Sequence, residues 1–568
     1  MGNLLQTSRL PYQGGFVFIL AGMRDFRIRL LHPGWKPFKM RQLIPMTYAS
    51  SIPADSHPLH ALARHRLGKL CVAIQAGSAA EMIERAEAAL ADAKFLEFRL
   101  DSLAKPAAAL PKMKEFLAEH RDVTAIATCR RKAFGGQFAG SLTAELQVLL
   151  DAAEGGCEIV DLEVESAEEA KPSALKEFRK GLRAEGTALL ISFHDFSRTR
   201  GLEQAADRIK AFEPDYVKVV STAKTLADNL AVLKLIEERS LSAQVVGIAM
   251  GEEGLVSRVL GPRAGAAFTF ASSSHGIETA PGQITARALL DVYRIDKLDR
   301  ATQLFGVAGN PIGHSFSPLM QNTAFRKENV NAVLLPLKVK AVDDLLKLAR
   351  GLPMAGVAVT MPLKQEVLPH LANMDALTVK IGACNTLRIG ADGKIVGFNT
   401  DVAGIVRPLE KRLKLKGTRV AVLGAGGAAR SAVFGLVGQG AEVFIVNRTH
   451  EKAMALAKEA KAKALKHEVF AKSHFDVLIN STPCGMTGSK QAMPIAANEL
   501  NAGLVFDMVY NPMETPLLKL ARERGIPVVT GLEMFVQQGA RQFEIWTGKP
   551  APEAEMLRVV ELELRRRG

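Results

Sequence analysis

Short apolar runs alternate with amphipathic stretches from Lys69 to about Asp296. The runs are rich in β-branched residues, and each is followed by a turn and a stretch rich in Ala, Leu, Glu and Lys. This alternation predicts parallel βαβ units, in which a crossover helix follows each strand. Eight such units in succession predict a (β/α)8 TIM barrel. The runs begin at Lys69, Phe95, Val123, Glu158, Ala188, Tyr216, Val245 and Ala266.

The pattern changes after a charged connector over residues 296–300. A new strand, QLFGVAGNP, begins at Gln303, and the run RVAVLGAGGAARSAV begins at Arg419. The second run reads as a strand, a Gly-rich turn and an Ala-rich helix, the order found in Rossmann domains. The chain is therefore expected to be an α/β protein with four parts. These are an extension over residues 1–66, a barrel over 67–298, a substrate domain over 302–402 completed by helices over 540–568, and a Rossmann domain over 403–539.

Composition narrows the class of partner. The 568 residues are 48% hydrophobic and 23% charged, as in ordinary globular proteins. No apolar run approaches the roughly 20 residues that span a bilayer, so we expect no membrane insertion. The net charge of +14 comes from dispersed basic residues, which favours small anionic substrates over nucleic acid. The five cysteines form no CxxC pair, which indicates a reducing, cytoplasmic compartment, and we expect no metal.

The first 66 residues differ from the rest. They contain Arg, Lys and Ser but almost no acid before Asp55. An acid-poor leader of this kind is typical of an organellar transit peptide, which would place the protein in a plastid. The alternative is an over-extended start, with the true initiator at Met23, Met40 or Met46. We favour the second interpretation and a cytoplasmic location.

Charged residues cluster where the predicted barrel strands end. Barrel chemistry takes place at the carboxyl ends of the strands, and a charge inside an apolar strand is costly unless it is paired. These positions predict a polar pocket that accepts anions. The residues are Glu97, Arg99 and Asp101 on the second run, Arg130 on the third, His194 on the fifth and Lys218 on the sixth.

Lys218 and His194 suggest covalent catalysis. Lys218 lies between Val217 and Val219, and an apolar neighbourhood would disfavour its ammonium form and free an amine for Schiff-base chemistry. The alternative is an inward lysine that pairs with a carboxylate such as Glu97. His194 supplies a group for proton transfer near neutral pH, which favours the catalytic interpretation of the pair.

Three motifs follow in the second half. GNPIGHSFSP places the hydroxyls of Ser315 and Ser317 at a strand-to-helix turn, where they could bind a carboxylate or simply cap the helix. Lys364 follows VTMP, and Asp401 follows FNT. A Lys and an Asp held together can protonate or polarise a carbonyl oxygen as hydride arrives, although a surface ion pair is the alternative.

The Gly-rich loop suits a dinucleotide. Its glycines allow close approach to pyrophosphate, whose charge meets the N-terminus of the following helix. The next strand ends about 20 residues on, at the distance expected for ribose recognition. It ends in Asn447, Arg448 and Thr449, and Arg448 with Lys452 suits a 2′-phosphate, which predicts NADP rather than NAD. The loop residues are Gly424, Ala425, Gly426, Gly427 and Ala428.

The first half resembles type I 3-dehydroquinate dehydratases. The resemblance rests on EFRLD (97–101), TCR ending at Arg130, His194, Lys218, the Ser257-Arg258 pair and APGQ (280–283). It implies that Lys218 forms an imine with the ketone of 3-dehydroquinate and that His194 moves the protons. It also implies that the substrate contacts Glu97, Arg99, Arg130, Arg258, Gln283 and Thr279, the last standing where Ser is usual.

One position departs from that family. Its members commonly carry Glu before the glycine pair that follows the third strand, where this chain has Phe134 before Gly135 and Gly136. That Glu normally orients the histidine. Its absence predicts that the tuning of His194 differs from that in the family.

The second half, from Gln303 onwards, resembles shikimate dehydrogenases. The resemblance implies that Lys364 and Asp401 carry the proton chemistry. The whole chain is thus similar to a bifunctional enzyme that dehydrates 3-dehydroquinate and then reduces 3-dehydroshikimate with NADPH, in the shikimate pathway to chorismate and the aromatic amino acids. The residues implied to contact shikimate are Ser315, Ser317, Thr360, Asn385, Asp401 and Gln538, with Tyr510 lining the site.

The sequence leaves two other functions open. A quinate/shikimate dehydrogenase would work oxidatively with NAD, and Arg448 argues against it. A non-catalytic ligand sensor or repressor built from the same domains should have lost Lys218, His194, Lys364 or Asp401, and none is lost, although Phe134 keeps the sensor interpretation open for the barrel half. We expect the chain to form a homodimer.

Overall fold

The computed structural model describes residues 67–313 and 315–567. The predicted extension over residues 1–66, with both of its interpretations, lies outside this part of the chain, as does His314 of the GNPIGHSFSP motif. Within the described residues, no helix combines the length and the apolar character needed to cross a membrane.

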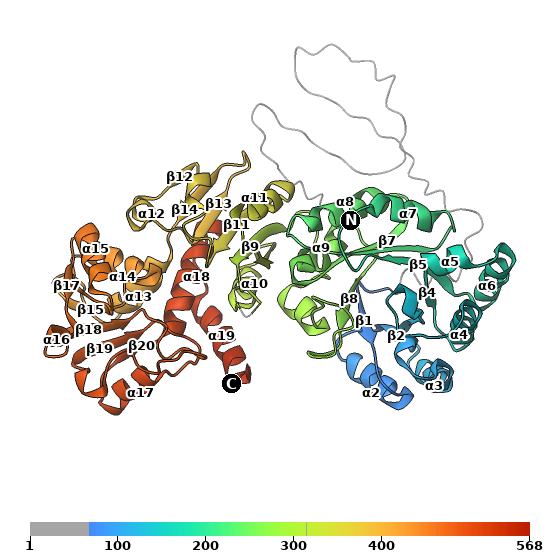
Figure 1. The fold of residues 1–568 in the computed structure, drawn as a ribbon, viewed down its shortest axis with the longest axis horizontal. Coiled ribbons are helices and arrows are strands. Elements are labelled where there is room, and N and C mark those ends of the chain that lie inside the picture. The colour runs from blue at the N-terminus through green and yellow to red at the C-terminus, as the bar shows by residue number, and fades with distance from the viewer. Residues whose placement is uncertain (1–66, 314, 568) are drawn as a thin grey trace, which may run out of the picture. The chain divides into compact units, whose positions relative to one another are not determined.

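Eight parallel strands form the first sheet (Figure 1), and all eight predicted strands are confirmed. Their order is β7-β6-β5-β4-β3-β2-β1-β8, and the backbone bond from Ala267 N to Val245 O, 2.8 Å long, links the two ends of this order. The sheet is therefore a nearly closed barrel. Its strands are β1 (Leu70–Ile74), β2 (Phe95–Arg99), β3 (Thr124–Thr128), β4 (Ile159–Glu163), β5 (Ala188–His194), β6 (Tyr216–Thr222), β7 (Gln244–Met250) and β8 (Thr269–Ser272).

Helices follow the barrel strands and cover the outside of the barrel (Figure 1). Alternate residues of each strand face the helices or the barrel interior. On β6, Val217 and Val219 join the apolar core that also holds the helices, whereas Tyr216 and Val220 join the interior cluster. The helices are α2 (Ala79–Ala89), α3 (Leu110–Glu119), α4 (Leu142–Glu154), α5 (Val164–Glu169), α6 (Pro172–Glu185), α7 (Leu202–Lys210), α8 (Asp228–Arg239) and α9 (Leu255–Ala264).

The second sheet is mixed and has the order β10-β9-β11-β13-β14-β12. β10 and β11 run parallel to β9, whereas β13 pairs antiparallel with both β11 and β14. Its elements are β9 (Gln303–Gly309), α10 (Ser317–Lys327), β10 (Ala332–Lys338), α11 (Val342–Gly351), β11 (Met354–Val359), β12 (Asn373–Met374), α12 (Ala376–Ile381), β13 (Thr386–Ile389) and β14 (Ile395–Phe398).

The third sheet is fully parallel, with the order β17-β16-β15-β18-β19-β20. α13 (Asp401–Glu410) precedes it. The chain builds the sheet from β15 outwards to one edge and then returns to add β18 on the other side of β15, which is the doubly wound arrangement of Rossmann domains. The elements are β15 (Arg419–Leu423), α14 (Gly427–Gly438), β16 (Glu442–Val446), α15 (His450–Ala460), β17 (Lys463–Leu465), α16 (His467–Phe470), β18 (Phe475–Asn480), β19 (Ala502–Asp507), α17 (Pro516–Glu523) and β20 (Val528–Val529).

Two C-terminal helices return to the second sheet. α18 (Gly531–Thr547) begins with the capping box of Thr530 and Glu533, and α19 is Glu553–Arg567. Phe543 of α18 and Val560 of α19 are buried in one cluster with Phe305 of β9 and Phe325 of α10. The last helices of the chain thus complete the core of the substrate domain.

Candidate active sites

A pocket opens inside the barrel at the carboxyl ends of its strands. All eight barrel residues that the sequence singled out as catalytic or substrate-binding line it, although they come from segments nearly 190 positions apart. The lining consists of Glu97, Arg99, Arg130, Gly135, His194, Phe196, Lys218, Val220, Ile248, Met250, Arg258, Phe270, Thr279, Ala280 and Gln283.

The side chain of Lys218 is buried in this pocket beside charged groups. Its Nζ donates to Asp161 Oδ2 at 2.7 Å, lies 3.7 Å from Glu97 Oε1, and sits 4.2 Å from the centre of the Phe270 ring. The prediction that Lys218 lies in an apolar neighbourhood is therefore wrong, and the alternative of an inward lysine that pairs with a carboxylate is found instead. The two flanking valines face the helices, because successive side chains of a strand point to opposite faces.

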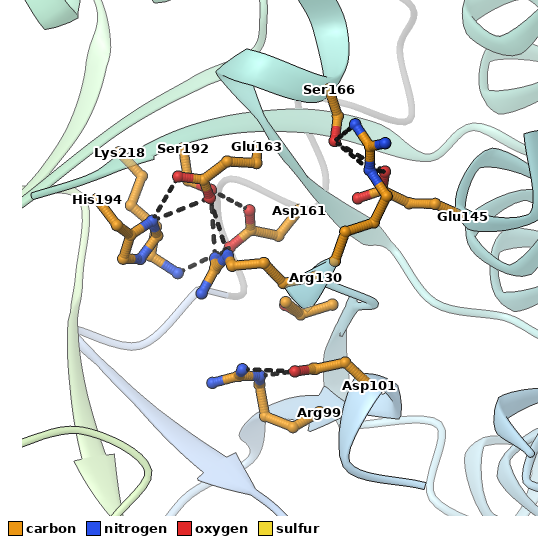
Figure 2. A network of polar contacts seen from close by, with 12 residues as sticks. Arg99, Asp101, Arg130, Glu145, Asp161, Glu163, Ser166, Ser192, His194 and Lys218 are labelled. Atoms are coloured by element: carbon orange, nitrogen blue, oxygen red, sulfur yellow. Dashed lines mark hydrogen bonds and ion pairs between the residues drawn. The ribbon is translucent and has the colours of Figure 1, made fainter. Parts of the chain in front are cut away.

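His194 points its Nδ1 at a carboxylate from the neighbouring strand (Figure 2). Both carboxylate oxygens of Glu163 lie 3.0 Å from this nitrogen. With the proton on Nδ1, the Nε2 lone pair is left to act as a base. Burial lowers the pKa of His194 well below its ordinary value, and the positive charges of Arg130 and Lys218 lower it further. The imidazole is therefore neutral at pH 7.

A buried network links these groups (Figure 2). Arg130 donates through Nε to Glu163 at 2.8 Å and lies 3.4 Å from Asp161, and the Ser192 hydroxyl lies within hydrogen-bond distance of both carboxylates. Burial opposes the ionisation of Asp161, but Lys218 and Arg130 outweigh it and hold the pKa of Asp161 well below its usual range. Burial raises the pKa of Glu163 to about 7, although Arg130 acts in the opposite direction.

Sequence reasoning missed three of these residues. Asp161 and Glu163 are charged residues inside the apolar run IVDLE of β4, and Ser192 lies opposite Glu163 on β5. The cost of an unpaired charge in a strand, which pointed to Glu97 and Arg130, applies equally to this pair. The signal was present in the fourth run and would have found both acids.

The remaining polar groups leave donors for a substrate. Arg258 is 1% exposed and is approached by no carboxylate in the described residues: its Nη2 donates to Pro281 O at 3.2 Å, and its Nε has no partner. Burial lowers the pKa of Arg258 to about 10, so it remains charged at neutral pH. A buried guanidinium that lines a pocket and pairs with no carboxylate is a receptor for a carboxylate.

Other pocket residues are held in place by neighbours. The backbone N–H and hydroxyl of Thr279 both donate to Gln283 Oε1, so the amide NH2 group of Gln283 is left to donate elsewhere. Arg99 makes a two-bond contact with Asp101, at 2.9 Å for each bond. The Thr128 hydroxyl donates to Glu97 at 2.8 Å.

Phe134 does not line this pocket. The guanidinium of Arg131 lies 4.9 Å from the centre of its ring, and Arg131 in turn pairs with Glu145 and Glu169. The expected partner of His194 is therefore absent from position 134. A carboxylate, that of Glu163 on β4, nevertheless faces the imidazole.

A second pocket brings together all eight residues singled out in the dehydrogenase half as catalytic or substrate-binding. Six of them lie in the substrate domain, and the other two, Tyr510 and Gln538, lie after β19 and in α18. The lining consists of Val307, Pro311, Ile312, Ser315, Ser317, Ala358, Val359, Thr360, Lys364, Asn385, Asp401, Met508, Tyr510, Gly531, Met534, Phe535, Gln538 and Gln542.

Lys364 and Asp401 form a close pair in this second pocket. Lys364 Nζ lies 2.6 Å from Asp401 Oδ2, and Asn385 Nδ2 donates to the other oxygen of Asp401 at 2.8 Å. The Lys364 side chain is one-third exposed, whereas that of Asp401 is mostly buried. Asp401 therefore holds the ammonium from the protein side and leaves it open to the pocket.

The hydroxyls of the GHSFSP turn are used differently. Ser315 Oγ accepts a bond from the Ser317 backbone N–H at 3.2 Å, whereas the Ser317 side chain makes no helix-capping bond. Burial raises the pKa of Tyr510, and Gln538 donates to Phe535 O.

Gln542 of α18 is a pocket residue that sequence reasoning missed. Its Nε2 donates to Asn385 O and to Thr386 Oγ1. Its only signal was its position one helical turn after Gln538.

The Gly-rich loop leaves space for a ligand backbone. Gly424 has φ of +114°, which favours glycine, and a Cβ there would meet Ser481 Oγ at 2.6 Å. A Cβ on Gly426 or Gly427 would meet nothing within 4 Å, and α14 begins at Gly427. The open approach to a helix N-terminus fits a pyrophosphate.

The turn after β16 carries unpaired positive charge. Asn447 Nδ2 donates to Thr449 O at 2.9 Å and fixes the turn. Arg448 and Lys452 are exposed, and neither forms an ion pair in the described part of the chain. These residues fit a phosphate on the adenosine ribose.

Family models match both halves of the chain. The model for type I 3-dehydroquinase matches residues 70–300. The shikimate dehydrogenase substrate-binding domain matches 307–387, the shikimate/quinate 5-dehydrogenase model matches 408–507, and the shikimate 5′-dehydrogenase C-terminal domain matches 531–561.

A chloroplastic bifunctional 3-dehydroquinate dehydratase/shikimate dehydrogenase of Arabidopsis thaliana is 34% identical over 85% of this chain and 82% of its own length. The chain belongs to this bifunctional family. Its dehydrogenase half is also similar to proteins named shikimate dehydrogenase (NADP(+)). The protein of Maridesulfovibrio salexigens is 39% identical over 46% of this chain and 94% of its own length. The protein of Methanosarcina acetivorans is 40% identical over 46% of this chain and 98% of its own length. The predicted family, fold class and pairing of a lyase with an oxidoreductase are confirmed.

Proposed function

We propose that the barrel pocket of this bifunctional enzyme dehydrates 3-dehydroquinate through an imine on Lys218, and that the second pocket reduces 3-dehydroshikimate to shikimate. The observation that carries the first assignment is that Lys218, which pairs with Asp161, and His194 line one pocket with the unpaired Arg258. Arg258 binds the substrate carboxylate, which places the ketone beside the amine.

In the first reaction, the amine of Lys218 replaces the ketone oxygen of the substrate, which leaves as water. The imine acidifies the neighbouring C–H, and His194 Nε2 takes that proton. The protonated His194 then donates to the departing hydroxyl, which leaves as a second water. Water finally hydrolyses the imine and restores Lys218. Lys218 and His194, which carry these steps, both line the pocket. Asp161 balances the positive charge on the nitrogen of Lys218.

In the second reaction, the ammonium of Lys364 donates a proton to the carbonyl oxygen that becomes the new hydroxyl. Asp401 and Asn385 hold Lys364 in position, and Ser315, Ser317, Thr360, Tyr510 and Gln538 bind the hydroxyls and carboxylate of the substrate. NADPH supplies the hydride, in agreement with the NADP named for the relatives. The open glycines, with Ala425 and Ala428 beside them, would hold its pyrophosphate, and Asn447, Arg448, Thr449 and Lys452 its 2′-phosphate.

One assay tests both halves. Purified protein is incubated with NADPH and either 3-dehydroquinate or 3-dehydroshikimate, and the absorbance of NADPH is followed. Consumption with both substrates supports both assignments. If only 3-dehydroshikimate is reduced, the barrel is not a dehydratase and the ligand-sensor alternative replaces it. Turnover of quinate with NAD that exceeds turnover of shikimate with NADP would favour the oxidative alternative.

Assembly and compartment remain predictions. We propose a cytoplasmic enzyme, with a plastid as the alternative because the Arabidopsis relative is named chloroplastic. Fusing residues 1–66 to a fluorescent protein in plant cells tests this: import into plastids would overturn the cytoplasmic proposal. Light scattering of the full chain tests the homodimer.

A further inference from the structure

The carboxylate that contacts His194 comes from the strand beside it. β4 and β5 pair in register, with Glu163 opposite Ser192, so Glu163 is the diagonal neighbour of His194 on the same face of the barrel. Glu163 is 3% exposed and lies 3.0 Å from Nδ1 (Figure 2). No other hydrogen bond is formed by the His194 ring within the described residues.

The rest of the network fixes this carboxylate. Oε2 of Glu163 accepts a bond from Arg130 Nε at 2.8 Å and lies 2.9 Å from the Ser192 hydroxyl, whereas Oε1 contacts only the imidazole among the described residues. Both oxygens lie 3.0 Å from Nδ1, and one of them is anchored by Arg130. A carboxylate held in this way sets both the ring orientation and the tautomer of a histidine.

Position 134 is not available for the same task. The ring of Phe134 packs against the guanidinium of Arg131. Arg131 is held there by ion pairs with Glu145 of α4 and Glu169 of α5. The neighbouring Gly135 reaches the pocket, but Phe134 does not line it. An acid in this loop, as the resemblance led us to expect, is absent.

We propose that Glu163 is the positioning residue for His194 in this chain and takes over the task of the acid missing at position 134. This inference rests on the proposed dehydration, in which His194 moves the protons. Glu163 touches no reacting atom. It keeps the proton on Nδ1 so that Nε2 can accept one from the substrate.

The test compares Glu163→Gln with Glu145→Gln in the full chain. Glu145 is a matched control because it is 1% exposed, pairs with an arginine and a serine of the same barrel, and lies outside the pocket. Reduction of 3-dehydroshikimate by the second half of each variant verifies that the chain is folded, and melting temperatures report any loss common to both variants.

In Glu163→Gln we expect kcat for dehydration to fall by roughly 100-fold, within the range for general acid–base catalysis, with KM changed little. Borohydride should still trap 3-dehydroquinate on Lys218, detected by intact mass. The kinetic isotope effect with substrate deuterated next to the ketone should rise, because proton abstraction becomes slower. Glu145→Gln should retain wild-type kcat.

Three results would overturn the proposal. They are a wild-type kcat in Glu163→Gln, an equal loss in Glu145→Gln, or a loss of imine trapping that matches the loss of rate. Failure of the proposed function is distinguishable, since the wild-type protein itself would then neither trap 3-dehydroquinate nor dehydrate it.

Discussion

Lys218 Nζ and Asp161 Oδ2 lie 2.7 Å apart inside the barrel, and both side chains are buried. Removing one partner of a buried ion pair leaves the other charge uncompensated. Asp161→Asn should therefore destabilise the barrel by about 3–5 kcal/mol, measured by calorimetric or denaturant unfolding. Asp122→Asn is the control, since Asp122 pairs with Lys94 at the surface and its loss should cost at most about 1 kcal/mol. Equal effects of the two substitutions would contradict the paired state of Lys218.

The pKa values of His194 and its neighbours predict how kcat/KM for dehydration changes at low pH. The active base is the neutral imidazole, and the lowered pKa of His194 keeps the imidazole neutral as pH falls through 6.5. The charged groups that face it are Glu163, Arg130, Lys218, Asp161 and Arg99. Burial raises the pKa of Glu163 to about 7, so we expect kcat/KM to decline as pH falls through about 7, where Glu163 takes up a proton and no longer accepts a hydrogen bond from Nδ1.

The control for this profile is the second reaction of the same chain. Reduction of 3-dehydroshikimate at each pH shows whether the protein remains intact. A rate that stays level from above pH 7 to well below 6.5, with the chain intact, would mean that dehydration does not need the ionised form of Glu163.

The eight barrel strands followed from local information, because apolar alternation and turn residues lie within single segments of the sequence. The environment of Lys218 did not. Val217 and Val219 are its neighbours along the chain, but Asp161, from a strand two positions away around the barrel, is its neighbour in space. Reading the sixth run alone could not supply that contact.

The second pocket illustrates the same limit. Lys364 and Asp401 were paired through the family resemblance, and their distance of 2.6 Å bears out that contact. Gln542 reaches Asn385 only because α18 returns to the substrate domain after the whole third sheet. A contact across 157 positions depends on how the helix packs, which no local pattern records.

Arg258 should dominate binding of the substrate carboxylate. Hydrogen bonds to a charged group contribute about 1.5–3 kcal/mol, so Arg258→Gln should raise KM for 3-dehydroquinate by roughly 10–150-fold. Arg263→Gln is a close control, since Arg263 also lies on α9, also has an unpartnered Nε and donates to one backbone carbonyl, but lies outside the pocket. Steady-state kinetics of both variants decide the matter: an unchanged KM in Arg258→Gln would show that the carboxylate binds elsewhere.

Lys364 should be required for reduction but not for dehydration. Lys364→Met removes the proton donor, and we expect kcat for reduction to fall by about 10²–10⁴-fold, the range for general acid catalysis. Lys394→Met changes an exposed lysine of the same domain that pairs with Asp392, and it should have no effect. Dehydration of 3-dehydroquinate, followed directly by product absorbance, should be equal in both variants. Full reductase activity in Lys364→Met would place the proton donor on another group.

Arg448 should determine the preference for NADPH over NADH. It is exposed and unpaired in the described part of the chain, so its guanidinium can form charge-assisted bonds with a 2′-phosphate. Arg448→Gln should raise KM for NADPH by about 10-fold or more, because a bond to a charged group contributes at least about 1.5 kcal/mol. NADH lacks that phosphate, so its KM should change less than about twofold on the same argument. Arg524→Gln is the control, since Arg524 follows α17 and donates to Leu500 O. If Arg448→Gln raised both KM values equally, Arg448 would support the fold of the turn and not the phosphate, and Lys452 would become the residue to test.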